Sequence, residues 1–148
     1  MIPTWKRWTN LAASVVLALL AGCGRSHGTA AVNGVVIYKD KPVADATVSF
    51  LPKGEQPDAK SATGKTDAGG RFTLTTYFDA DDQPPGALPG SYAVTITKID
   101  EPQGAFDPHK DPPPKNHLPV KYGSPRDSPL SAEVKLSGGN HFEFKLTD

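Results

Sequence analysis

The sequence predicts an all-β protein, an antiparallel β-sandwich of about seven strands. Three observations lead to this prediction. Apolar residues recur at every second position in short runs, glycine and proline separate these runs, and no helix of ordinary length is evident. About seven such runs in roughly 100 residues are typical of an immunoglobulin-like arrangement of two sheets.

Each run has one apolar face, which we expect to point into the core. The first run, Val32 to Tyr38, is apolar on both sides, as in a central strand. Ser61 to Thr66 is a weaker, polar strand. In the other runs the residues expected to face inward are Ala46, Val48 and Phe50; Phe72 and Leu74; Tyr92, Val94 and Ile96; Ala132, Val134 and Leu136; and Phe142, Phe144 and Leu146.

Turn residues separate the runs at consistent places. The segment 39–42 ends the first strand, because Pro42 fixes φ and removes a ladder donor. The segment 67–70 predicts a hairpin, since Asp67 can cap its own turn and Gly70 accepts a positive φ. A third turn, 137–140, joins the last two strands.

The amino-terminal segment has the three zones of a secretory leader. Lys6 and Arg7 precede an apolar stretch from Leu11 to Leu20, which is about half the length that a membrane-spanning helix needs. Leu20, Ala21, Gly22 and Cys23 follow in the order of a bacterial lipobox, which they resemble. We therefore expect residues 1–22 to be a lipoprotein signal peptide, 23–30 a lipidated tether and 31–148 one domain. An ordinary cleaved signal peptide is the alternative.

Lipidation at Cys23 predicts an exported protein that is anchored to a membrane by its lipid. The lipobox resemblance implies a location on the periplasmic face or at the cell surface. If the envelope is diderm, Gly24 in place of an aspartate resembles the outer-membrane sorting pattern. Cys23 is the only cysteine, and lipidation would use its thiol, so we expect no internal disulfide, no thiolate metal site and no cysteine nucleophile. No cofactor is expected. The predicted mature part has 14 basic and 16 acidic residues, which does not suggest nucleic-acid binding.

Three stretches between residues 34 and 98 resemble a carboxypeptidase regulatory-like domain, the transthyretin-like branch of β-sandwiches. They are Gly34, Val35 and Pro42 to Val48; Thr66, Asp67, Gly70 and Phe72; and Leu88, Pro89, Gly90, Tyr92 and Val94. The resemblance implies a transthyretin-like sandwich that serves as a binding or structural module. The same fold includes hydroxyisourate hydrolases, but their Tyr-Arg-Gly-Ser ending is absent here.

Two loops are candidate binding sites, because loops on a rigid β scaffold often carry function. The first, Tyr77 to Leu88, combines aromatic and acidic side chains that could bind calcium or stack on a sugar; the alternative is a solvated turn. Its candidate residues are Tyr77, Phe78, Asp79, Asp81 and Asp82. With Tyr92, Phe106 and Tyr122, the two aromatic residues of this loop could form a stacking platform, although we expect Tyr92 to lie in the core.

The second loop is a Pro-rich insertion at residues 100–129. It holds eight of the chain's 15 prolines, and so long a connection is either functional or disordered. His109 and His117 lack a third ligand, so we expect exposed histidines rather than a zinc site. The insertion is predicted to be a rim or a partner-binding loop.

No nucleophile lies in a recognisable catalytic setting, so we expect the protein not to be an enzyme. The predicted function is a non-enzymatic binding or structural module of the cell envelope. Its partners are expected to be the membrane, through the lipid on Cys23, and an envelope protein or glycan. A carbohydrate-binding module and a transthyretin-like hydrolase are the alternatives.

Overall fold

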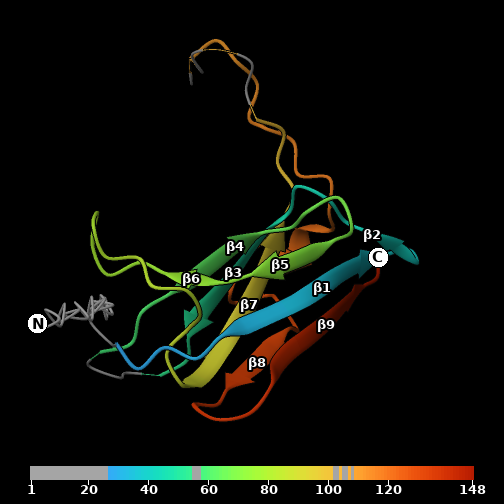
Figure 1. Ribbon diagram of the computed structural model, residues 1–148. Helices are drawn as coiled ribbons and strands as arrows, with labels where there is room; N and C mark the ends of the chain where they lie inside the picture. The colour runs from blue at the N-terminus through green and yellow to red at the C-terminus, as the bar shows by residue number, and fades with distance from the viewer. Residues whose placement is uncertain (1–26, 55–57, 102–103, 105–106, 108) are drawn as a thin grey trace, which may run out of the picture.

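The computed structural model describes residues 27–54, 58–101, 104, 107 and 109–148. The predicted signal peptide and Cys23 lie outside these residues. The described part forms two β-sheets packed face to face (Figure 1), which confirms the predicted all-β sandwich.

Seven strands of three or more residues form the sandwich, at the seven predicted places. They are β1 (Val32–Tyr38), β3 (Thr47–Pro52), β4 (Ala62–Lys65), β5 (Arg71–Thr73), β7 (Gly90–Thr97), β8 (Ser131–Val134) and β9 (Asn140–Leu146). Two short strands, β2 (Lys41–Pro42) and β6 (Thr75–Thr76), and one 3-10 turn, η1 (Val120–Tyr122), complete the described elements.

The strand β1 is the centre of the smaller sheet. β9 pairs with one edge of β1, while β2 and β5 pair with successive parts of its other edge. The second sheet has the order β6-β4-β3-β7-β8 and is antiparallel throughout. The antiparallel sandwich was predicted, and one strand pair differs from it, because β9 runs parallel to β1. The chain changes sheets after β8, and β9 therefore meets β1 while running in the same direction.

The core lies between the sheets and contains nearly all the residues that alternation predicted. Phe50, Val48, Val94 and Ile96 are fully buried, and Phe72, Leu74, Tyr92, Phe144 and Leu146 are at most 6% exposed. Phe142 is half-buried and packs against this core. Leu136 is an error of prediction, since it is 68% exposed. The Asn140 side chain bonds both the N–H and the C=O of Lys135, which turns the chain away after β8 ends at Val134.

The turn at 67–70 has the predicted chemistry but not the predicted pairing. The Asp67 carboxylate accepts hydrogen bonds from the N–H groups of Gly69 and Arg71 at 2.8 and 2.9 Å, and Gly70 has φ +73°. The strand after this turn pairs with β1 as β5 and, beyond Leu74, with β4 as β6. The segment 71–76 therefore crosses from one sheet to the other instead of forming a simple hairpin.

Candidate functional site

The loop between β6 and β7, residues 77–88, holds the amino-terminal segment of the described chain. The His27 ring stacks on Phe78 with 4.2 Å between ring centroids, and its Nε2 lies 2.7 Å from Oδ2 of Asp82. The side chains of His27 and Asp82 are only 21% and 22% exposed. These contacts keep the segment beside the loop.

Backbone contacts fix the same segment a few residues later. Ala30 donates to the carbonyl of Ala87 and accepts from its N–H, at 2.8 and 3.0 Å. A side chain on Gly86 would place its Cβ 2.1 Å from the Ala30 carbonyl oxygen, and Gly86 has φ +95°. Ala30 is 6% exposed and belongs to the core. We call the contacts of His27 and Ala30 with Phe78, Asp82 and Ala87 the tether clasp.

The clasp uses two of the five residues that were predicted to form the first binding loop. Phe78 and Asp82 contact the protein's own chain, whereas Tyr77, Asp79 and Asp81 are exposed around a tight turn. Among the described residues, no group of three or more histidine, cysteine, aspartate or glutamate side chains could hold a metal ion. The folded part also includes residues 27–30, which the sequence analysis assigned to the tether.

The second predicted loop, 100–129, divides into two parts. Its later part belongs to the fold, because Leu118 and Tyr122 are 5% and 3% exposed and contribute to the core. The Asn116 side chain accepts from the N–H groups of Lys98 and Leu118, both at 3.1 Å. In the earlier part, His109 is exposed, and exposed His117 pairs with Asp100 at 2.8 Å. The role as a rim or partner-binding loop stays a prediction, and the later part of the loop also contributes to the core.

A groove of about 760 Å³ crosses the outer face of the smaller sheet, where no candidate was predicted. Register places Thr73, Asn33 and His141 in one row across β5, β1 and β9, and Arg71 opposite Val35 in the next row. Lys65 and the 67–70 turn close one end. In the sequence, the groove residues appear only as polar residues on the outward side of their strands. Alternation alone does not distinguish them from ordinary solvent-exposed residues.

Donor groups of Asn33, Lys65 and Arg71 line the groove together with one described carboxylate, that of Asp67, whose Oδ1 accepts from the N–H groups of Gly69 and Arg71. His141 Nδ1 is bonded to Oδ1 of Asn33, which leaves the Asn33 amide N–H groups directed elsewhere. The Arg71 guanidinium is exposed and takes part in none of the ion pairs found among the described residues. Lys65 is held by Glu101 at 2.8 Å, and that hydrogen bond raises the pKa of the lysine. Such a surface suits a ligand rich in acceptor oxygens.

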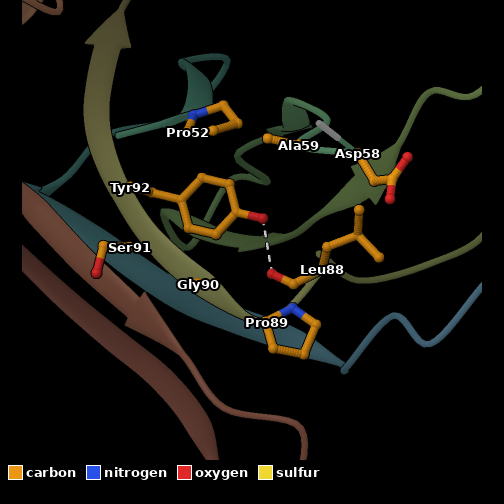
Figure 2. A pocket seen from close by; sticks show the side chains of 8 residues that line it. All are labelled: Pro52, Asp58, Ala59, Leu88, Pro89, Gly90, Ser91 and Tyr92. Atoms are coloured by element: carbon orange, nitrogen blue, oxygen red, sulfur yellow. Dashed lines mark hydrogen bonds between the residues drawn. The ribbon is translucent and has the colours of Figure 1, made fainter. Parts of the chain in front are cut away.

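A smaller pocket of about 350 Å³ lies at the start of β7 (Figure 2). Pro52, Leu88 and Pro89 contribute to its wall, and Asp58 is the one carboxylate among the described lining residues. The Tyr92 hydroxyl donates to the Leu88 carbonyl at 2.7 Å, as the dashed line in Figure 2 shows. Burial raises the pKa of the Tyr92 phenol above its ordinary value of 10.0, so the hydroxyl remains a donor. This pocket brings no acid and base together.

The described aromatic residues do not gather into a stacking platform. Tyr92 and Tyr122 are core residues, Phe78 is covered by His27, and Tyr77 is 60% exposed on its own loop. Phe106 lies outside the described residues.

Comparison of the chain with protein-family models, curated proteins and solved structures finds no match. In the described part of the chain, no helix has the length and apolar character needed to cross a bilayer.

Proposed function

We propose that this chain is an exported, lipid-anchored protein whose β-sandwich acts as a non-enzymatic binding or structural module of the cell envelope. The tether clasp carries the proposal. His27 is four residues beyond Cys23 in the sequence, and it already contacts Phe78 and Asp82. A fold that begins so soon after the lipobox would hold the domain next to the membrane. The resemblance to carboxypeptidase regulatory-like domains of small lipoproteins agrees with this role.

Processing of the full chain tests the lipid anchor. In the wild type we expect maturation that globomycin, an inhibitor of lipoprotein signal peptidase, blocks, and we expect fatty acid on the new terminus by mass spectrometry. Cys23→Ser removes the only thiol and should abolish both globomycin sensitivity and membrane retention. Retention and processing unchanged in this variant would contradict the proposal.

The groove favours a binding role over a purely structural one. The Arg71 guanidinium and the Asn33 amide line the groove together with the carboxylate of Asp67, and the Lys65 ammonium beside them is paired with Glu101 at 2.8 Å. Arginine forms charge-assisted hydrogen bonds with both carboxylates and phosphates. The ligand class that fits is therefore an anionic component of the envelope that carries one of these groups, such as an acidic glycan.

Binding of an acidic glycan tests the proposed role of the groove. The probe is polygalacturonate, measured by calorimetry against the mature chain, residues 23–148, with Cys23→Ser. Arg71→Ala should weaken binding about tenfold or more, because a hydrogen bond to a charged group contributes about 1.5–3 kcal/mol. Arg126→Ala is the matched control, since Arg126 is also exposed but lies outside the groove. Equal losses in the two variants would indicate nonspecific attraction.

A further inference from the structure

The covalent path between the lipobox and the fold is short. Cys23 and His27 are four residues apart, and an extended chain spans at most about 3.3–3.6 Å per residue. Their Cα atoms can therefore be no more than about 14 Å from each other. A lipid on Cys23 would keep His27 within that reach of the bilayer surface.

Because the tether clasp fixes His27 to one end of the sandwich, the limited distance from Cys23 applies to that end of the domain as well. His27 is held by the ring of Phe78 and the carboxylate of Asp82, and Ala30 by two backbone hydrogen bonds to Ala87. The loop 77–88 therefore stays beside the amino-terminal segment. In Figure 1 this loop lies on the amino-terminal side, near the beginning of β1.

The opposite end of the sandwich is farther away than the tether can reach. β7 runs from Gly90 to Thr97, which is roughly 23 Å at about 3.3 Å per residue. The 67–70 turn, the β1–β2 turn and the carboxyl terminus lie together at its far end (Figure 1). Lys39 and Asp148 form an ion pair there at 2.9 Å.

The chemistry of the clasp end argues against its insertion into a lipid bilayer. Asp79 and Asp81 are exposed, and carboxylates are costly in hydrocarbon and are repelled by anionic headgroups. Tyr77 is the one large apolar side chain exposed on this loop, at 60%. The acyl chain, not the domain, would therefore provide the attachment.

We propose that the end of the sandwich formed by the clasp and the 77–82 turn faces the lipid surface, and that the 67–70 turn points away from it. This orientation rests on the proposed lipidation of Cys23. It leaves the far end and the groove on the outer face of β1, β5 and β9 accessible to partners in the surrounding compartment.

A pair of alanines offers a matched test of the orientation. Ala80 and Ala68 are both exposed and both lie at turn tips, one at each end of the sandwich. Because acylation uses the only native thiol, Ala80→Cys and Ala68→Cys each provide a single site for a fluorescent maleimide. The labelled, acylated full chain is reconstituted in phosphatidylcholine vesicles that contain headgroup-labelled acceptor lipid.

Energy transfer to the acceptor lipid should be several-fold stronger from position 80 than from position 68. Equal transfer from the two positions, or stronger transfer from position 68, in vesicle-bound protein overturns the orientation and leaves the lipid anchor intact. Failure of the wild type to bind vesicles more than Cys23→Ser does overturns both proposals.

Lengthening the tether gives an independent check. A ten-residue Gly-Ser insertion after Gly24 leaves the clasp sequence unchanged but extends the covalent reach. It should lower energy transfer from position 80 toward the value at position 68. Transfer unaffected by the insertion would show that direct contact, not the short tether, sets the orientation, and would overturn the argument from reach.

Discussion

The two loops predicted as binding sites are both used by the fold, but in different ways. The 77–88 loop holds the amino-terminal segment mainly through the 2.7 Å contact of His27 with Asp82, a ring stack and two backbone hydrogen bonds. The later part of the 100–129 loop is held by burial of Leu118 and Tyr122 in the core. The side chains of His27 and Asp82 in the first attachment are polar and 21% and 22% exposed, beside the buried backbone pair of Ala30 and Ala87. The second attachment buries two large apolar side chains.

This difference separates a loop that stabilises the fold from a loop that fixes where the amino-terminal segment lies. Buried side chains contribute several kcal/mol each, whereas a partly exposed ion pair contributes less than about 1 kcal/mol. The 116–123 segment should therefore be part of the cooperative fold. The clasp should fix the direction in which the chain leaves the domain, with a smaller effect on global stability.

The largest expected effect is at Leu118. Leu118→Ala removes a side chain that is 5% exposed and should lower the free energy of unfolding by about 2–5 kcal/mol, measured by urea denaturation. Val120→Ala is the control, because Val120 is two residues away and 83% exposed, and its change should stay within about 0.5 kcal/mol. Equal effects would mean that the Pro-rich segment is not packed into the core.

Gly86→Ala tests the close approach in the clasp. Its Cβ would meet the Ala30 carbonyl at 2.1 Å, so the variant should lose about 1–3 kcal/mol and the amide protection of Ala30 and Ala87 in hydrogen exchange. Gly138→Ala is the control. Gly138 has φ +111°, but its added Cβ would meet no atom within 4 Å, so this variant measures the backbone strain alone. If Gly138→Ala loses as much protection at Ala30, the close approach is not the cause.

Tyr92→Phe tests the hydrogen bond at the start of β7. Loss of the bond to the Leu88 carbonyl should cost about 1 kcal/mol at neutral pH. Because burial raises the pKa of the folded phenol, the unfolded chain loses its proton first, and wild-type stability should fall as pH rises above 10.0. Tyr92→Phe should reduce this alkaline loss, whereas exposed Tyr77→Phe should leave it as in the wild type.

The smallest effect is expected at the contact between His27 and Asp82 in the clasp. Asp82→Asn should lower the free energy of unfolding by less than about 1 kcal/mol, measured by urea denaturation. Asp81→Asn, an exposed neighbour without an ion pair among the described residues, should leave that free energy unchanged. A loss at Asp82 as large as that at Leu118 would erase the contrast between the two loops.

Alternation was sufficient to predict the strands, because a period of two depends only on neighbouring residues. Val48 and Phe50 are fully buried, as their pattern requires. The error at Leu136 has a cause outside its own strand, since the Asn140 side chain ends β8 by binding the Lys135 backbone. Local patterns carry no information about such a contact.

The candidate sites depended on contacts between distant parts of the chain, which the sequence alone did not reveal. His27 meets Asp82 from 55 positions away, so an acidic turn that looked free is partly occupied. Leu118 lies among prolines and charges and shows no strand period, yet it enters the core. The groove joins residues of β1, β5 and β9, and only the strand register brings them into one row.

The parallel pairing of the first and last long strands has a mechanical consequence. Paired residues run from Val32 and Asn140 to Tyr38 and Leu146. A force that enters at the beginning of β1 and is resisted at the end of β9 would slide these strands along each other, and the hydrogen bonds between them would share the load. A domain pulled at its amino terminus is in this way protected from opening one bond at a time.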